Sequence, residues 1–110
     1  MTSHRLESLE ALAATVEARK GASPESSYTA KLLSQGIEKC AKKFGEEAVE
    51  LALAAMTANK QHAASEAADV LYHLLVLLAA SDVPLAAVMA ELDRRQGVSG
   101  IAEKASRPKD

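Results

Sequence analysis

Apolar residues recur at intervals of three and four along most of this chain, a spacing that places them on one face of an α-helix. Leu9, Leu12 and Val16 follow this pattern among charged residues, and they predict a first amphipathic helix over about residues 5–20. The next segment, GASPESS, contains glycine and proline and lacks this periodicity. It is therefore predicted to be a loop.

The longest periodic stretch predicts a second helix over about 28–58, with serines just before it that can cap its first turn. Gly36 and Gly45 are the positions inside it where a bend or close backbone packing would be easiest. A third helix is predicted over about 61–81, after a short polar turn. Its second half is apolar nearly all the way round, so it has to be buried, and contact with another subunit would bury it.

Pro84 suits the first turn of a fourth helix, which ends at Gly97. Residues 1–4 and about 98–110 are polar and are predicted to be loosely ordered. We find no strand pattern, internal repeat or domain boundary, so residues 1–110 are predicted to form one all-α domain. We expect a four-helix, bundle-like architecture in which the second and third helices form an antiparallel hairpin.

The composition agrees with a helical protein that associates with itself. Of 110 residues, 48% are hydrophobic, with one Phe, two Tyr and no Trp, and the abundant Ala and Leu favour helix. A chain of this length buries only a modest core, so we expect a homo-oligomer, at least a dimer. A formal net charge of −2 and the few aromatic residues argue against nucleic acid as a partner.

The single cysteine, Cys40, rules out an intramolecular disulfide and favours a reducing, cytoplasmic setting. Charged residues, Glu7 and Glu10 among them, occupy the positions where a signal peptide would need its apolar region. The apolar stretch 70–80 is too short to span a bilayer. We therefore expect a soluble protein with no membrane partner.

The candidate chemistry lies in two pairs of acidic residues with a spacing of three: Glu47 with Glu50, and Glu66 with Asp69. Residues three apart on a helix share one face, so each pair presents its carboxylates to the same region of space. Such charges repel one another unless a cation lies between them. Oxygen ligands without cysteine suit Mg²⁺, which leaves further positions to water and substrate phosphate. The pattern therefore predicts a metal-dependent enzyme that acts on a phosphorylated substrate.

Each of these residues also has a simpler interpretation. The acids could be solvated helix faces, although the apolar surroundings of the second pair make that costly. Lys43 could form an ion pair with Glu47, or, with Lys39, it could contact oxygens of a phosphate. His73 could bind the metal or support one of its ligands, but a histidine within LYHLLVLL is more often a hydrogen-bonded core residue.

Three segments carry a resemblance to a known family: SYTAKLLSQGIEKCAKKFGEEAVELALAA, SEAADVLYHLLVLL and ELDRRQGVSGIAEKASR. They closely resemble phosphoribosyl-ATP pyrophosphatases, which act in histidine biosynthesis, and the resemblance extends over about residues 6–107. Its most specific parts are Ser27-Tyr28-Thr29, Gly45-Glu46-Glu47 with Glu50, Glu66 with Asp69, and Tyr72-His73. The order of the acids also marks the wider all-α nucleoside triphosphate pyrophosphatase superfamily. Cys40 and Phe44 depart from the aliphatic residues expected at their positions.

The resemblance implies Mg²⁺-dependent hydrolysis of 1-(5-phosphoribosyl)-ATP between its α and β phosphates, which gives 1-(5-phosphoribosyl)-AMP and pyrophosphate. By position, it implies metal ligands at Glu47, Glu50, Glu66 and Asp69. It also implies that Glu46 acts beside Glu47 and Glu50 in catalysis, as a further ligand or as the group that orients the attacking water.

The same resemblance implies contacts between the nucleotide substrate and residues outside the acid pairs. The first turn of the second helix has free backbone N–H groups that favour phosphate, although its residues could simply cap the helix. The arginines at the end of the fourth helix complement the helix dipole, yet they could also reach a substrate's 5′-phosphate from a neighbouring subunit. The predicted substrate-binding residues are Ser27, Tyr28, Thr29, Lys39, Lys43, His73, Arg94 and Arg95.

Two other functions fit the same acid pattern. A house-cleaning pyrophosphatase of non-standard nucleoside triphosphates would share the acids but hydrolyse free deoxynucleoside triphosphates. A non-catalytic helical oligomerisation module would carry the acids as solvated surface charge.

Overall fold

The computed structural model describes residues 6–108, which form six α-helices and no strand. The helices are α1 (Glu7–Ala18), α2 (Tyr28–Ser34), α3 (Ile37–Ala55), α4 (Lys60–Ala80), α5 (Leu85–Arg95) and α6 (Gly100–Ser106). The all-α prediction is confirmed, and α1, α4 and α5 match the predicted first, third and fourth helices to within a few residues. The predicted start of the first helix at residue 5, and the loose order predicted for residues 1–4, concern residues outside the part that the structure describes.

The single helix predicted over 28–58 is wrong, because the chain breaks at Gly36 into α2 and α3. Gly36 has a φ of 91°, a left-handed conformation that glycine adopts freely and other residues adopt at a cost. Its N–H donates to the carbonyl oxygen of Leu33 (3.2 Å), and Gly36 is also the N-cap of α3. Gly45, the other position where a bend was expected, lies within α3.

The polar segment after Gly97 contains α6, where the sequence predicted only a loosely ordered tail. The Ser99 side chain caps this helix by accepting a hydrogen bond from the N–H of Ala102 (3.1 Å). Glu103 in α6 is 5% exposed and accepts hydrogen bonds from Arg94 and Arg107. Ion pairs between the buried carboxylate of Glu103 and exposed arginines hold this helix to α5, and apolar periodicity does not reveal such pairs.

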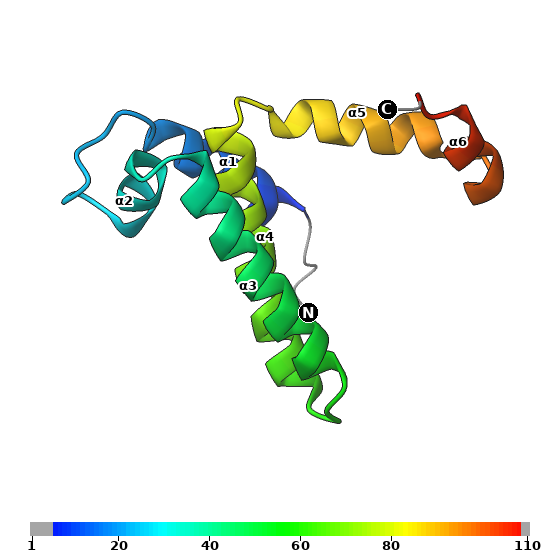
Figure 1. Cartoon of the computed structure of the whole chain (residues 1–110), viewed down its shortest axis with the longest axis horizontal. Helices are drawn as coiled ribbons and strands as arrows, with labels where there is room; N and C mark the ends of the chain where they lie inside the picture. Colours follow the sequence, from blue (N-terminus) through cyan, green and yellow to red (C-terminus); the bar gives the residue numbers. More distant parts are fainter. Residues whose placement is uncertain (1–5, 109–110) are drawn as a thin grey trace.

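Helices α3 and α4 form the predicted antiparallel hairpin, which is the longest element of the molecule (Figure 1). Helix α1 packs against the C-terminal half of α4, and α2 packs against both α3 and α4. The core lies where these four helices meet, away from the tip of the hairpin. Its buried members are Val16, Leu32, Cys40, Leu75, Val76 and Ala79.

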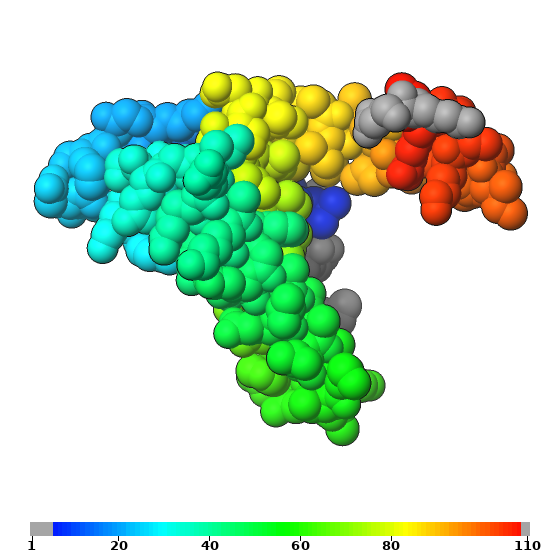
Figure 2. All heavy atoms as spheres, in the orientation of Figure 1, coloured from blue at the N-terminus to red at the C-terminus, as the bar shows by residue number. Residues whose placement is uncertain are grey.

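The hairpin tip and the α5–α6 segment project from this core as two separate arms (Figure 2). No residue of α5 is buried. Leu75 belongs to the chain's own core at 3% exposed, whereas Leu71 is 45% exposed, so only part of the predicted α4 surface is free to contact another subunit. Other large apolar side chains on α3, on α5 and beside α5 are exposed: Ile37, Val49, Leu53, Val83 and Leu92.

Helix α4 is the one helix within residues 6–108 that is long and apolar enough, by length and composition, to cross a membrane. The sequence prediction considered only the apolar stretch 70–80, which is too short to span a bilayer, and not the full length of the helix. The helix nevertheless carries Glu66, Asp69 and His73, and ionisable groups inside a bilayer are costly. It also pairs with α3 along the hairpin, and the buried residues of its C-terminal half contribute to the core.

Candidate active site

The hairpin brings together three of the four predicted acids. One ligand oxygen each from Glu47 on α3 and from Glu66 and Asp69 on α4 lie within 4.8 Å of one another. The turn between α3 and α4 reverses the chain, so that acids from both helices can meet. At the end of this turn Asn59 caps α4 by accepting a hydrogen bond from the N–H of His62 (3.0 Å). We call Glu47, Glu66 and Asp69 the acid cluster.

Glu50 lies beside the acid cluster, toward the tip of the hairpin. It acts electrostatically on Glu47 and lines, with Glu66, a hollow of about 290 Å³ between the two helices. His62 and Thr57 line the same hollow. The predicted four-acid set is therefore close together, with Glu50 at its solvent-exposed end.

The acid cluster has the electrostatics of a site that could hold a cation. Loss of solvent raises the pKa of Glu47, and the charges of Glu50, Asp69 and Glu66 raise it further, while Lys43 opposes them. The Oε2 atom of Glu66 is buried and accepts no hydrogen bond from the described residues. Partly buried carboxylates that repel one another, one of them with a buried oxygen that lacks a hydrogen bond, fit a hard divalent cation better than a fully solvated helix face.

Lys43 pairs with Glu46 and not, as the simplest interpretation had it, with Glu47. Its Nζ lies 3.4 Å from Oε1 of Glu46. The pKa of Lys43 is raised, with its electrostatic interaction with the Tyr28 phenol as the largest cause. Lys39 is exposed one helical turn earlier on α3. These contacts place a positive charge next to the acid cluster, on the side that faces α2.

The first turn of α2 covers that side of the site. Ser27 caps the helix by accepting a hydrogen bond from the N–H of Ala30 (3.0 Å), which confirms the helix-capping interpretation of this segment. The hydroxyl of Thr29 is hydrogen-bonded to that of Tyr72 on α4 (2.5 Å). The rings of Tyr28 and Tyr72 are nearly parallel, at 20°, with centroids 6.5 Å apart.

His73 is buried, as expected of a core histidine, but its hydrogen bonding differs from the expectation. It is 7% exposed, and its Nδ1 has no hydrogen-bond partner among the described residues. Its ring meets that of Tyr72 edge to face, with centroids 4.9 Å apart. Burial lowers the pKa of His73, Lys43 lowers it further and Asp69 opposes this, so the imidazole is neutral near pH 7.

Tyr72 lies beside the candidate site, and no role of its own was predicted for it from the sequence. It stood in the resemblance only as half of the Tyr72-His73 pair. Its hydrogen bond joins residues 43 positions apart, and no local spacing announces such a contact. A usable signal was that only two tyrosines and one phenylalanine occur in the chain.

Arg94 and Arg95 are not brought to the acid cluster within one chain. They end α5, on the arm that points away from the hairpin (Figure 1). Arg94 Nη2 lies 2.5 Å from Glu91 and 2.9 Å from Glu103, and Arg95 Nε lies 3.2 Å from Glu91. These pairs lower the pKa of Glu91 to about 2. Any contact with a substrate at the acid cluster would have to come from another copy.

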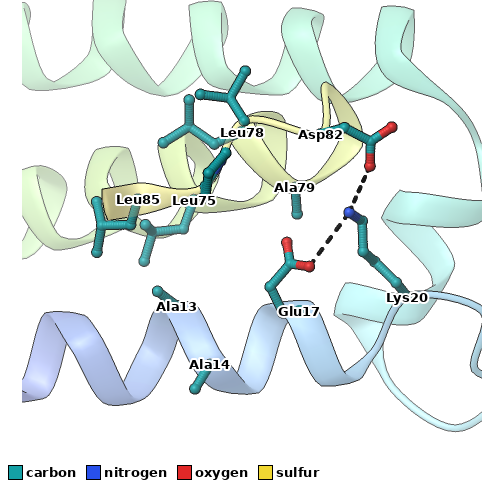
Figure 3. A pocket seen from close by; sticks show the side chains of 11 residues that line it. Ala13, Ala14, Glu17, Lys20, Leu75, Leu78, Ala79, Asp82 and Leu85 are labelled. Atoms are coloured by element: carbon teal, nitrogen blue, oxygen red, sulfur yellow. Dashed lines mark hydrogen bonds and ion pairs between the residues drawn. The ribbon is translucent and has the colours of Figure 1, made fainter. Parts of the chain in front are cut away.

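A separate hollow of about 300 Å³ lies between α1 and the turn from α4 to α5 (Figure 3). Its lining is mostly Ala and Leu, and its rim holds Lys20, which pairs with Asp82 (2.8 Å) and Glu17 (3.4 Å). Asp82 has a φ of 57° at the corner from which α5 departs. This hollow contains none of the acid cluster and serves to join α1 to that corner.

The fold and site define a class of protein: an α-helical hairpin that gathers carboxylates able to hold a metal ion, with a lysine beside them. The sequence model of the family described as phosphoribosyl-ATP pyrophosphohydrolase matches residues 9–96. This range includes the acid cluster, Lys43 and both tyrosines. The chain belongs to this family, and the resemblance stated from the sequence is confirmed.

Curated relatives agree with the family match. A protein of Cereibacter sphaeroides is 72% identical over 99 residues, which are 90% of this chain and 96% of that protein. Proteins of Dinoroseobacter shibae (66%; 90% and 97%) and Ruegeria pomeroyi (64%; 92% and 96%) are similar over nearly the same lengths. All three are named phosphoribosyl-ATP pyrophosphatase.

Proposed function

We propose that this chain hydrolyses 1-(5-phosphoribosyl)-ATP to 1-(5-phosphoribosyl)-AMP and pyrophosphate, a step of histidine biosynthesis, and that it depends on Mg²⁺. The observation that carries the proposal is the acid cluster, whose ligand oxygens lie within 4.8 Å of one another. The family match and the names of its relatives supply the substrate. A cytoplasmic location is part of the proposal, since the substrate derives from ATP.

Glu47, Glu66 and Asp69, joined by Glu50, would hold the metal. The buried, unpartnered oxygen of Glu66 and the raised pKa of Glu47 are the features that fit this role. When bound, Mg²⁺ lowers the pKa of coordinated water and neutralises charge on the phosphates. In the proposed reaction, the oxygen of water bonds to one of the two phosphorus atoms, the P–O bond from that atom to the bridging oxygen breaks, and the bridging oxygen keeps the electron pair. Water gives up a proton, and the products are 1-(5-phosphoribosyl)-AMP and pyrophosphate.

The remaining residues bind and orient the reactants. Glu46, tethered to Lys43 at 3.4 Å, orients the attacking water or adds a further ligand. Lys43 and Lys39 offset negative charge on phosphate oxygens as the leaving group develops. His73 lies buried behind Lys43 and Asp69, where a neutral imidazole can donate or accept one hydrogen bond at Nδ1.

We further propose that the protein is at least a dimer. The exposed apolar residues Val49 and Leu53 on α3, with Leu71 on α4 and Leu92 on α5, form more unpartnered surface than a small soluble monomer usually carries. A second copy packed there would cover these residues. It could also bring its Arg94 and Arg95 toward a substrate's 5′-phosphate.

A pyrophosphate-release assay tests the function. Phosphoribosyl-ATP and a panel of free deoxynucleoside triphosphates are each given to the protein with Mg²⁺, or with a chelator in its place. We expect release from phosphoribosyl-ATP only, and only with Mg²⁺. Release mainly from free deoxynucleoside triphosphates would favour a house-cleaning enzyme, and no release from any of them would favour a non-catalytic module.

A further inference from the structure

The aromatic residues of this chain are concentrated at one end of the candidate site. The sequence holds two Tyr, one Phe and no Trp, and both tyrosines meet on the Lys43 side of the acid cluster. They come from different helices, Tyr28 from the first turn of α2 and Tyr72 from the middle of α4. Helix packing has therefore placed both beside the proposed phosphate site.

The two rings differ in what they do for the fold. Tyr72 packs against the core, meets His73 edge to face, and is fixed by the hydrogen bond between its hydroxyl and Thr29. Tyr28 is 55% exposed and does not belong to the core. Its packing within this chain is its near-parallel approach to Tyr72. A large ring exposed beside a site in this way has a face available for a ligand.

The position of Tyr28 relative to the acids suits a nucleotide. Tyr28 stacks against Tyr72, which lies one helical turn beyond Asp69 on α4, and its phenol also interacts electrostatically with Lys43 on α3. Lys43 is one helical turn from Glu47, roughly 5–6 Å between Cβ atoms. A substrate whose phosphates lie at the acid cluster would therefore need only a ribose and one phosphate to reach from there to Tyr28. The hollow at the opposite end, beside Glu50, is lined by no Tyr, Phe or Trp, and its one ring is the imidazole of His62.

We propose that the adenine of the substrate stacks on the exposed face of Tyr28, and that Tyr72 and Thr29 hold α2 in the position that presents this ring. Purine rings stack on aromatic side chains regardless of their hydrogen-bonding pattern, so the contact provides affinity and orients the nucleotide. This inference rests on the proposed function, because it takes a nucleotide to be the substrate. Tyr28 and Tyr72 are thus positioning residues that bind and align the base and take no part in bond cleavage.

The absence of Trp from the sequence gives a direct test, since the ultraviolet fluorescence of the protein comes almost entirely from Tyr28 and Tyr72. The protein is titrated, in Mg²⁺, with AMP, with ribose 5-phosphate and with inorganic phosphate. N-acetyltyrosinamide titrated in parallel corrects for light absorbed by adenine. We expect saturable quenching by AMP that ribose 5-phosphate and phosphate do not produce, and that largely disappears in Tyr28→Phe. Equal effects of AMP and ribose 5-phosphate would overturn the inference.

Two substitutions at the same position separate stacking from other roles of Tyr28. Tyr28→Phe keeps the ring and should retain the AMP affinity measured by calorimetry. Tyr28→Leu removes the ring from an exposed position, where the fold tolerates the change, and should weaken AMP binding by roughly 5- to 100-fold. The KM for phosphoribosyl-ATP should rise by a similar factor, with a much smaller change in kcat.

The two proposals fail in distinguishable ways. If wild-type protein releases pyrophosphate from phosphoribosyl-ATP but Tyr28→Leu has an unchanged KM and AMP affinity, the stacking role is wrong and the proposed function stands. If wild-type protein releases no pyrophosphate and binds no AMP, the nucleotide assignment itself is wrong, and the stacking role is wrong with it. Circular dichroism and melting curves of both variants establish that they are folded.

Discussion

Replacing Glu66 with glutamine should stabilise the metal-free protein and abolish its response to Mg²⁺. The substitution keeps the shape of a partly buried side chain and removes one of three carboxylate charges whose oxygens lie within 4.8 Å. Two unit charges at that separation repel by about 0.9 kcal/mol in water and about 3.5 kcal/mol at an effective dielectric constant of 20. The partial exposure of the acid cluster and the salt of the buffer favour the lower value.

Glu66 faces two such neighbours, so the loss of its charge should raise the free energy of unfolding by about 1–2 kcal/mol when no divalent cation is present. For a domain of this size each kcal/mol corresponds to roughly 4–8 °C in Tm. With Mg²⁺ the wild type should melt at a higher temperature than Glu66→Gln, because the wild type gains binding energy that the variant has lost. Pyrophosphate release should fall roughly 100-fold or more with the loss of a metal ligand.

The assay is thermal denaturation followed by circular dichroism, at one protein concentration, in chelator and in saturating Mg²⁺. Glu38→Gln is the matched control, because Glu38 is an exposed glutamate in the first turn of α3, the other helix of the hairpin. It should lose a few tenths of a kcal/mol through the helix dipole and keep the full Mg²⁺ response. The reasoning would be refuted if, in chelator, Glu66→Gln melted at a lower temperature than the wild type, and if Mg²⁺ raised the Tm of the variant as much as that of the wild type.

Three further predictions concern other parts of the molecule. Asp69→Asn should leave the protein folded and lower pyrophosphate release roughly 100-fold or more, and near-normal release at saturating Mg²⁺ would exclude Asp69 as a ligand. Because the pKa of Glu47 is raised in the folded state, the folded protein binds more protons, so without metal the stability of the wild type relative to Glu47→Gln should fall as pH rises above 4.5; a pH-independent difference between their unfolding free energies would contradict this. Sedimentation equilibrium should give at least twice the chain mass of 11.6 kDa for the wild type and a shift toward monomer for Leu53→Asp, whereas a stable wild-type monomer would rule out the proposed assembly.

The sequence by itself was enough for the helical class, three of the helices and the pairing of the acids. Apolar spacing of three and four predicts α1, α4 and α5 because it gives each an apolar face, although in α5 no residue of that face is buried within the single chain. The spacing of three within Glu47/Glu50 and Glu66/Asp69 places each pair on one helix face for the same local reason. The family resemblance added the substrate, which no spacing contains.

Tertiary structure decided what depends on residues far apart in the chain. The break at Gly36 follows from the packing of α2 against α3 and α4, since a sequence pattern allows either a bend or a straight helix at a glycine. The relative rotation of α3 and α4 decided that Glu47, and not Glu50, completes the acid cluster with Glu66 and Asp69. The meeting of Tyr28 with Tyr72 depends on the same packing, because side chains on different helices become neighbours only when the helices are docked.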